Sequence, residues 1–203
     1  MSDHYFSADP GSAEKRVTVV AGVWGRELRL QSASGVFAHG RLDIGTSVLF
    51  RATPPPVEPG TFLDLGCGYG VIGCALASAV PTSLVWAVDL NERALRLTSD
   101  NAAALGLADR VTPALPEQVP DGLVFDEIWS NPPIRIGKPA LHELLSMWLP
   151  RLAPDGRAVL VVGKNLGADS LQRWIGEQGY RCDRLASAKG FRVLEVRPRD
   201  PQR

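Results

Sequence analysis

The chain has 203 residues, of which 45% are hydrophobic and 22% charged, and its formal net charge is zero. This composition suits one globular core of ordinary size, and the balanced charge excludes a global positive field that would draw the chain to nucleic acid. The polar start, the short apolar runs and the three cysteines predict no signal peptide, no membrane span, no disulfide framework and no metal site. We therefore expect a soluble protein of the reducing cytoplasm with no membrane partner.

The first 53 residues predict an extension made of short elements. Two β-rich runs flank Trp24-Gly25, a pattern that predicts a β-hairpin. The next stretch is too rich in glycine for a regular element, and after it we expect a short helix and a stiff proline connector. The expected strands are 17–23 and 27–31, the glycine-rich stretch is 35–46, the helix is 47–52 and the connector is 54–59.

From residue 60 onward, short apolar strands alternate with helical patterns. Runs such as 158–162 are apolar without alternation, which indicates parallel strands buried on both faces. Strands joined by helices imply right-handed crossovers and a doubly wound α/β sheet, whereas the last two strands should pair antiparallel at one edge. The expected strands are 61–65, 84–89, 110–114, 125–130, 157–162, 180–186 and 192–197, and the expected helices are 71–79, 91–105, 140–152 and 168–178.

A glycine-rich loop, Asp64-Leu65-Gly66-Cys67-Gly68-Tyr69-Gly70, closes the first of these strands and opens a helix. Glycines at this point let the backbone turn sharply and approach a ligand beside a helix N-terminus. Asp89 ends the next strand, where an acid can accept both hydroxyls of a ribose, and Asp64 can take an amino-acid ammonium directly or through water. A ligand with both parts is S-adenosylmethionine. We predict that it is bound by Asp64, Gly66, Cys67, Gly68, Gly70 and Asp89.

The same loop also matches a dinucleotide fingerprint. Gly68, Gly70 and Gly73 have its glycine spacing, and Asp89 follows at roughly the expected ~20-residue distance. Against NAD, Asp64 would place a negative charge near a pyrophosphate, and the antiparallel tail suits a methyltransferase sheet better than a dehydrogenase sheet. S-adenosylmethionine is therefore favoured, with NAD as the alternative.

Asn131-Pro132-Pro133 follows the fourth core strand, at the same sheet edge as the glycine loop. Aromatic amines are poor nucleophiles because the nitrogen lone pair is delocalised. The side-chain carbonyl of Asn131 and the backbone carbonyl of Pro132 can each accept one amine hydrogen, which favours a pyramidal nitrogen whose lone pair points at the sulfonium methyl. Asn131 and Pro132 are thus predicted to be catalytic, although Asn-Pro-Pro is also an ordinary turn sequence.

With these residues assembled, the sequence resembles the Rossmann-like class I methyltransferases. Within them it is similar to the small-domain family typified by the bacterial 16S rRNA guanine-N2 methyltransferase, in particular its stand-alone, single-domain members. The resemblance runs from His4 to about Arg197. It is carried by residues 4–7, 35–37, 40–46, 64–70, 89, 131–135, 137–138 and 190–194.

The resemblance implies methyl transfer from S-adenosylmethionine to an exocyclic amino group, with a guanine in small-subunit rRNA as the target. It implies that Phe37, Gly45 and Thr46 line the cofactor pocket, so we expect residues 1–53 to form a hairpin and cofactor-lid extension of a core at 54–203. Two positions depart from the family pattern. After the third strand, Glu117 or the backbone is left to contact the adenine, and Ile134 stands where many amine methyltransferases have a stacking aromatic side chain.

Cationic residues gather at the predicted open edge of the sheet and predict phosphate contacts to RNA despite the zero net charge. Three hypotheses stay open: a guanine methyltransferase for RNA, a methyltransferase for another planar amine or amide (adenine in DNA or tRNA, or a protein glutamine), and a non-catalytic platform that binds cofactor and RNA. RNA, as rRNA or within a small ribosomal subunit, is the expected partner of a monomer or homodimer. The predicted substrate-binding residues are Pro133, Ile134, Arg135, Lys138, Lys164 and Arg192.

Overall fold

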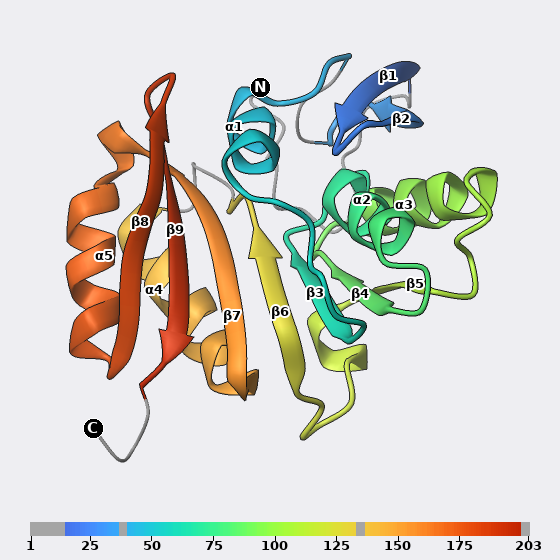
Figure 1. Cartoon of the computed structure of the whole chain (residues 1–203). Helices are drawn as coiled ribbons and strands as arrows, with labels where there is room; N and C mark the ends of the chain where they lie inside the picture. The colour runs from blue at the N-terminus through green and yellow to red at the C-terminus, as the bar shows by residue number, and fades with distance from the viewer. Residues whose placement is uncertain (1–14, 37–39, 133–136, 200–203) are drawn as a thin grey trace.

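The computed structural model describes residues 15–36, 40–132 and 137–199. Within them, seven strands form one sheet in the order β5-β4-β3-β6-β7-β9-β8. The five strands from β5 to β7 run parallel (Figure 1). The strands of this sheet are β3 (Thr61–Leu65), β4 (Leu84–Val88), β5 (Val111–Ala114), β6 (Phe125–Ser130), β7 (Leu152–Gly163), β8 (Tyr180–Ala188) and β9 (Phe191–Pro198). The predicted Rossmann-like, mostly parallel α/β sheet is confirmed.

The last two strands form the predicted antiparallel hairpin at one edge of the sheet. β9 pairs antiparallel with β7 on one side and with β8 on the other. The two-residue turn between β8 and β9 has φ values of 49° at Lys189 and 81° at Gly190. Positive φ at both central residues is the turn geometry that matches the twist of a hairpin.

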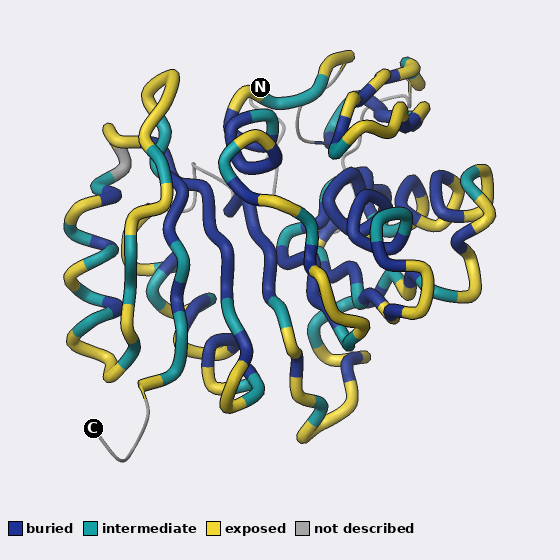
Figure 2. Tube along the Cα trace, viewed as in Figure 1, coloured by how far each residue is buried: buried dark blue, intermediate teal, exposed yellow. Residues whose placement is uncertain are grey.

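The central strands β3 and β7 are buried on both faces, which explains why β3 and the second half of β7 are rich in apolar residues without alternation, whereas the edge strand β8 has no buried residue (Figure 2). Along β7, Val159 and Val161 belong to the core shared with α1, α2 and α3, whereas Ala158, Leu160 and Val162 belong to the core shared with α4 and α5. The helices are α1 (Ile44–Ala52), α2 (Val71–Ala79), α3 (Glu92–Ala104), α4 (Gly137–Trp148) and α5 (Ala168–Glu177).

Several element boundaries differ from the sequence-based expectation; β7 begins at Leu152 instead of residue 157, and α4 begins at Gly137 instead of residue 140. α1 begins at Ile44, within the stretch predicted to be irregular, because the Asp43 side chain accepts a hydrogen bond from Thr46 N and caps the helix. α4 ends at Trp148 because Pro150 cannot continue an α-helix; a 3-10 turn follows, and β7 begins at Leu152. The predictions that the helix starts at residue 47 and that α4 continues to residue 152 were therefore wrong.

The predicted N-terminal hairpin is confirmed as a separate two-stranded sheet, β1 (Arg16–Val23) and β2 (Arg26–Ala33). Its turn holds Trp24 at φ 48°, a left-handed conformation that is strained for a tryptophan. The contacts of the indole compensate for this strain. Nε1 donates to Thr53 O at 2.8 Å and to Phe50 O at 3.2 Å, and the ring lies edge-on to Trp129 at 5.7 Å between centroids. The hairpin tip therefore holds the C-terminal end of α1 against β6.

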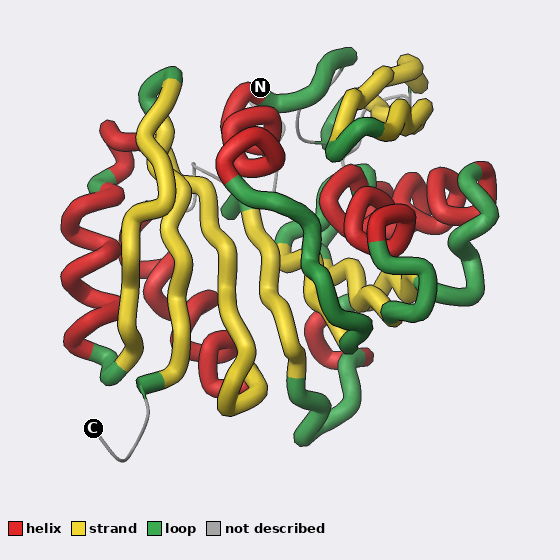
Figure 3. The backbone as a smooth tube through the Cα atoms, in the orientation of Figure 1, coloured by secondary structure: helices red, strands yellow, loops and turns green. Residues whose placement is uncertain are grey.

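The crossover from β5 to β6 differs from the other crossovers of the parallel sheet. In the described structure it contains only a 3-10 turn, η1 (Pro116–Gln118), where a doubly wound sheet usually places an α-helix (Figure 3). The apolar sheet surface next to η1 borders a cavity instead. Among the described residues, no helix has the length and apolar character needed to cross a membrane.

Candidate active site

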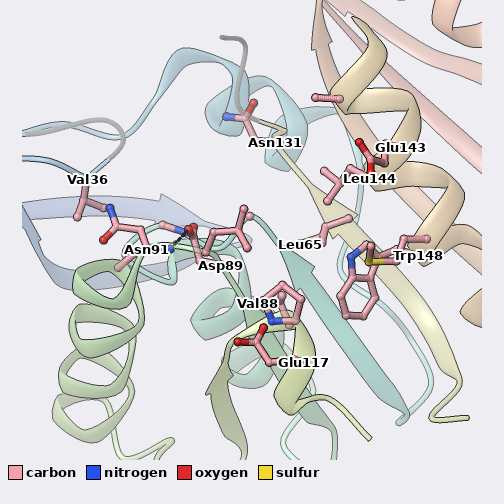
Figure 4. Close-up of a pocket in the computed structure, with 17 residues that line it drawn as sticks. Val36, Leu65, Val88, Asp89, Asn91, Glu117, Asn131, Glu143, Leu144 and Trp148 are labelled. Carbon is pink, nitrogen blue, oxygen red and sulfur yellow. Dashed lines mark hydrogen bonds between the residues drawn. The ribbon is translucent and has the colours of Figure 1, made fainter. Parts of the chain in front are cut away.

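A cavity of about 380 Å³ opens at the carboxyl ends of β3, β4 and β6. This is the edge where open α/β sheets bind ligands, and the volume lies in the range of small-molecule pockets. Figure 4 shows side chains from the glycine loop, α4 and η1 converging on it. Of the predicted cofactor and catalytic residues, Gly66, Gly68, Asp89 and Asn131 line this cavity.

The glycine loop is bonded to the end of the neighbouring strand β4. The backbone N–H groups of Gly66 and Cys67 both donate to Val88 O, at 2.8 and 3.0 Å. Gly70 has φ 81°, and a Cβ at this position would lie 2.6 Å from Thr98 Cγ2. Only glycine fits there, so the close packing of the loop against α3 explains this part of the motif.

Asp89 links the glycine loop to the N-terminus of α3. Its Oδ2 accepts from Gly68 N and its Oδ1 accepts from Asn91 N, both at 2.9 Å (Figure 4). Burial raises the pKa of its carboxyl despite these backbone hydrogen bonds. Each carboxylate oxygen has a further lone pair, so Asp89 can accept hydroxyl hydrogens from a ligand in the cavity.

Asp64 lies behind the loop and does not line the cavity. Its side chain is fully buried, Oδ2 accepts from Gly73 N at 2.8 Å, and Oδ1 has no hydrogen-bond partner in the described structure. Burial raises the pKa of this carboxyl to about 7. A buried carboxyl with one unpaired oxygen favours a nearby positive group, so a contact with a ligand ammonium stays a prediction.

Of the remaining predicted cofactor residues, those that the structure describes do not line the cavity. Cys67 contacts Thr98 Oγ1 at 3.6 Å, and burial raises the pKa of its thiol, which keeps the sulfur protonated. Gly45 and Thr46 are buried in the first turn of α1, and Gly70 is buried under α3. Phe37 is outside the described residues. The part of the chain that the structure describes contains no cluster of residues suited to a metal ion.

Asn131 follows the last residue of β6 and is only 8% exposed. Its Nδ2 donates to Asp43 Oδ2 at 2.7 Å and to Thr46 Oγ1 at 2.9 Å. Both side-chain donors are therefore engaged at the N-terminus of α1, whereas Oδ1 accepts no hydrogen bond within the described residues. Pro132 is buried beside it, and Pro133 lies outside the described part. The sequence assigned no role to Asp43, although its N-cap pattern before an apolar run was a usable signal.

One wall of the cavity was not predicted. It comes from α4, whose residues Ala140, Leu144, Met147 and Trp148 repeat at helical spacing. That periodicity indicates an apolar face but not that the face borders a cavity. Trp148 is 1% exposed, and its Nε1 has no partner among the described residues. The opposite side of the cavity includes Glu117 from η1, so its suggested contact with an adenine stays a prediction. The other lining residues missed are Val36, Leu65, Val88, Leu90, Asn91, Ala94, Pro116 and Glu143.

Three of the predicted substrate-binding cations, Lys138, Lys164 and Arg192, are among the described residues, and none of them lines the cavity. Lys138 packs against Gly167, where a Cβ would lie 2.7 Å from the lysine Cε, and Lys164 is exposed after β7. Arg192 is 14% exposed and forms an ion pair with Asp169. This ion pair neutralises part of the positive charge that was predicted to contact phosphates. Ile134 and Arg135 fall outside the described residues.

Several known proteins are similar to this chain in sequence. Residues 27–195 match the sequence profile of the methyltransferase small domain. The Bacillus subtilis protein YbxB is 30% identical over 199 residues, which cover 97% of this chain and 99% of that protein. The ribosomal RNA small subunit methyltransferase C of Pseudomonas aeruginosa is 35% identical over 181 residues, 84% of this chain and 51% of that protein.

Among solved structures, the fold is similar to that of the T. thermophilus 16S rRNA N2 G1207 methyltransferase (RsmC) in complex with AdoMet and guanosine. The TM-score is 0.77 at 24% identity, with 94% of this chain and 52% of that chain covered. The chain thus spans nearly all of the Bacillus protein but about half the length of the small subunit methyltransferase C relatives it matches.

Proposed function

The chain belongs to the methyltransferase small-domain family, a family of S-adenosylmethionine-dependent enzymes, and we propose that it methylates the exocyclic amino group of a nucleobase. The proposed target is guanine N2 in small-subunit rRNA. One observation carries this proposal. The amide of Asn131 is held beside the cavity with both donors engaged, and its oxygen is left as an acceptor.

The residues around the cavity suit the cofactor. Asp89 offers carboxylate lone pairs at the sheet edge, where a ribose can bind through its hydroxyls. The apolar walls of the cavity suit an adenine ring, and the unpaired indole N–H of Trp148 offers a ring nitrogen one donor. The unpaired Oδ1 of Asp64 supplies a negative site behind the glycine loop for an ammonium group. When bound, S-adenosylmethionine supplies an electrophilic methyl group on a sulfonium sulfur.

The protein contributes orientation and hydrogen-bond acceptors to the transfer. Asn131 Oδ1 and the Pro132 carbonyl oxygen each accept one hydrogen of the target amine, which directs the nitrogen lone pair toward the methyl carbon. The nitrogen–carbon bond forms as the carbon–sulfur bond breaks, and the sulfur keeps the bonding electron pair. The surplus amine proton then leaves to water, so no strong base is needed. This is catalysis by positioning and electrostatic preorganisation.

Two further observations support an RNA target. Relatives that share about a third of their residues with this chain are named as small-subunit rRNA methyltransferases. Lys138 and Lys164 are exposed near the carboxyl ends of the strands, where they can contact phosphates. We also propose that the first 53 residues act as a cofactor lid, because Val36 lines the cavity and Gly35 O accepts from Asn91 Nδ2. Pro133, Ile134, Arg135 and Arg192 complete the proposed substrate site.

The test uses methyl-labelled S-adenosylmethionine with five separate acceptors: unmodified small ribosomal subunits, naked 16S rRNA, tRNA, DNA and a protein extract. We expect label in the subunits or the rRNA, recovered as N2-methylguanosine after digestion. Asn131→Ala should lower the single-turnover rate by roughly 10- to 1,000-fold, as expected when one preorganised hydrogen-bond partner of a transition state is lost. The dissociation constant of the cofactor should stay within about twofold, because the amide acts on the amine.

Gln178→Ala is the matched control, because Gln178 is an exposed amide that does not line the cavity. Label only in tRNA, DNA or protein would keep the chemistry and overturn the rRNA target. Turnover by Asn131→Ala at the level of the control would overturn the catalytic role of the amide. Cofactor binding without any labelled acceptor would favour the non-catalytic platform.

A further inference from the structure

Asp43 makes two contacts with one oxygen atom. Its Oδ2 accepts from Thr46 N at 3.0 Å, which caps α1, and from Asn131 Nδ2 at 2.7 Å. The second contact joins residues 88 positions apart in the sequence. The carboxylate therefore connects the start of α1 to the loop that leaves β6.

The two acceptors that hold the Asn131 amide differ in what they can impose. A threonine hydroxyl donates or accepts, so Thr46 alone is compatible with either orientation of the amide. An ionised carboxylate only accepts, and a reversed amide would bring Asn131 Oδ1 against Asp43 Oδ2 with no hydrogen between them. Asp43 therefore decides the direction of the amide, and the Thr46 hydroxyl follows as the second acceptor.

We propose that Asp43 is a positioning residue for methyl transfer, which fixes the Asn131 amide so that Oδ1 faces the target amine. This inference rests on the proposed function. The hydrogen bond is charge-assisted, so it holds the amide more firmly than a neutral contact does. It also polarises the amide, because negative charge near Nδ2 increases the partial negative charge on Oδ1. Both effects strengthen Oδ1 as an acceptor.

The surrounding structure keeps Asp43 in place. A Cβ on Gly45 would lie 3.0 Å from Phe191 Cε1, so the first turn of α1 packs directly against β9. At the other end of the helix, the Trp24 indole donates to Phe50 O and Thr53 O. Both ends of α1 are fixed, so the carboxylate is presented to Asn131 by a rigid element, as precise positioning requires.

The test separates the orienting role of Asp43 from its role as a helix cap. Asp43→Ser keeps a good N-cap acceptor, but its side chain is one atom shorter and cannot hold Asn131 as well. We expect its single-turnover rate at saturating cofactor and acceptor to fall about tenfold or more, the size expected for losing one charge-assisted contact. Cofactor affinity should stay within about twofold. Asp43→Asn retains an oxygen acceptor, so its single-turnover rate should lie between those of Asp43→Ser and the wild type. Asp121→Ser, at an exposed position, is the control.

A double-mutant cycle then asks whether Asp43 acts through Asn131. In the Asn131→Ala background, Asp43→Ser should cause no further loss of rate. In a nitrogen-15 NMR spectrum, the Asn131 side-chain amide protons, identified by their absence in Asn131→Ala, should exchange slowly in the wild type and rapidly in Asp43→Ser. Losses that multiply in the double variant, or unchanged amide exchange, would overturn the inference. If Asn131→Ala itself is fully active, the proposed function fails, whatever Asp43→Ser does.

Discussion

Asp64→Asn tests how much unfolding free energy is lost when the buried carboxyl beneath the glycine loop ionises. The Asp64 side chain is fully buried, and burial raises its pKa from 3.8 to about 7. The folded state therefore binds this proton more tightly than the unfolded chain, in which an aspartate titrates near its ordinary value. The stability contributed by the protonated carboxyl is complete below about pH 4 and is lost as the pH rises toward about 7.

The change in unfolding free energy can be calculated from the size of the Asp64 pKa shift. About three pKa units correspond to about 4 kcal/mol of unfolding free energy, of which about 3 kcal/mol falls between pH 4.5 and pH 8. Asparagine has nearly the same shape, and its Oδ1 can still accept from Gly73 N, but it does not ionise. Its buried NH2 would lack a partner at a cost of about 1–3 kcal/mol, which is the same at every pH. The pH-dependent part of the difference between the two proteins is therefore free of this cost.

The assay is urea unfolding followed by tryptophan fluorescence, at five pH values from 4.5 to 8, for the wild type, Asp64→Asn and the exposed control Asp121→Asn. Relative to the wild type, Asp64→Asn should gain about 3 kcal/mol of unfolding free energy across this range, whereas the control should not change. A difference between Asp64→Asn and the wild type that stays constant with pH would refute the reasoning, because it would mean that the carboxyl does not titrate in this window.

Three further predictions concern the glycine loop and the cavity. Gly70→Ala should lower the unfolding free energy by about 2–5 kcal/mol, because φ is positive and the added methyl would overlap Thr98. The control Gly176→Ala, at an open helical position, should not lower the unfolding free energy. Equal denaturation midpoints for the two variants would contradict this prediction. Asn101→Leu should loosen the N-terminal hairpin and weaken cofactor binding, because the Asn101 amide is hydrogen-bonded to the backbone of both β2 and the glycine loop. Faster limited proteolysis of the hairpin and weaker cofactor binding in calorimetry would confirm this. Wild-type behaviour in both assays would contradict a link between the hairpin and the glycine loop. Trp148→Phe should reduce cofactor affinity roughly threefold to tenfold, because Nε1 has no acceptor among the described residues and a bound ligand can provide one. Unchanged affinity in calorimetry would exclude this contact.

Periodicity was sufficient to predict the sheet. The run Ala158–Val162 is apolar at every position because its odd and even residues enter two different cores, and this is visible in the sequence itself. The same holds for the glycine loop, since a positive φ and a close approach both require glycine. Asn131 could be placed at the cavity because it follows a strand at the edge where ligands bind in open α/β sheets.

Contacts between distant segments could not be predicted in this way. Asp43 stands in a glycine-rich stretch, and its role appears only when α1 and β6 are placed side by side. The apolar stripe of α4 has the same spacing whether it covers a strand or borders a cavity. The ion pair of Arg192 with Asp169 likewise depends on how α5 packs on the final hairpin. In each case the contact depends on a partner from another element of the fold.

The short crossover between β5 and β6 has a consequence for the energetics of binding. Where a helix would usually cover the sheet, Leu65 and Val88 line a cavity that is open to a ligand. A bound ligand then packs against apolar side chains that a helix would otherwise cover. Because it binds the folded chain and not the unfolded one, at a concentration one hundred times its dissociation constant it adds about 2.7 kcal/mol to the unfolding free energy. Bound cofactor would thus stabilise the folded protein in addition to supplying the methyl group.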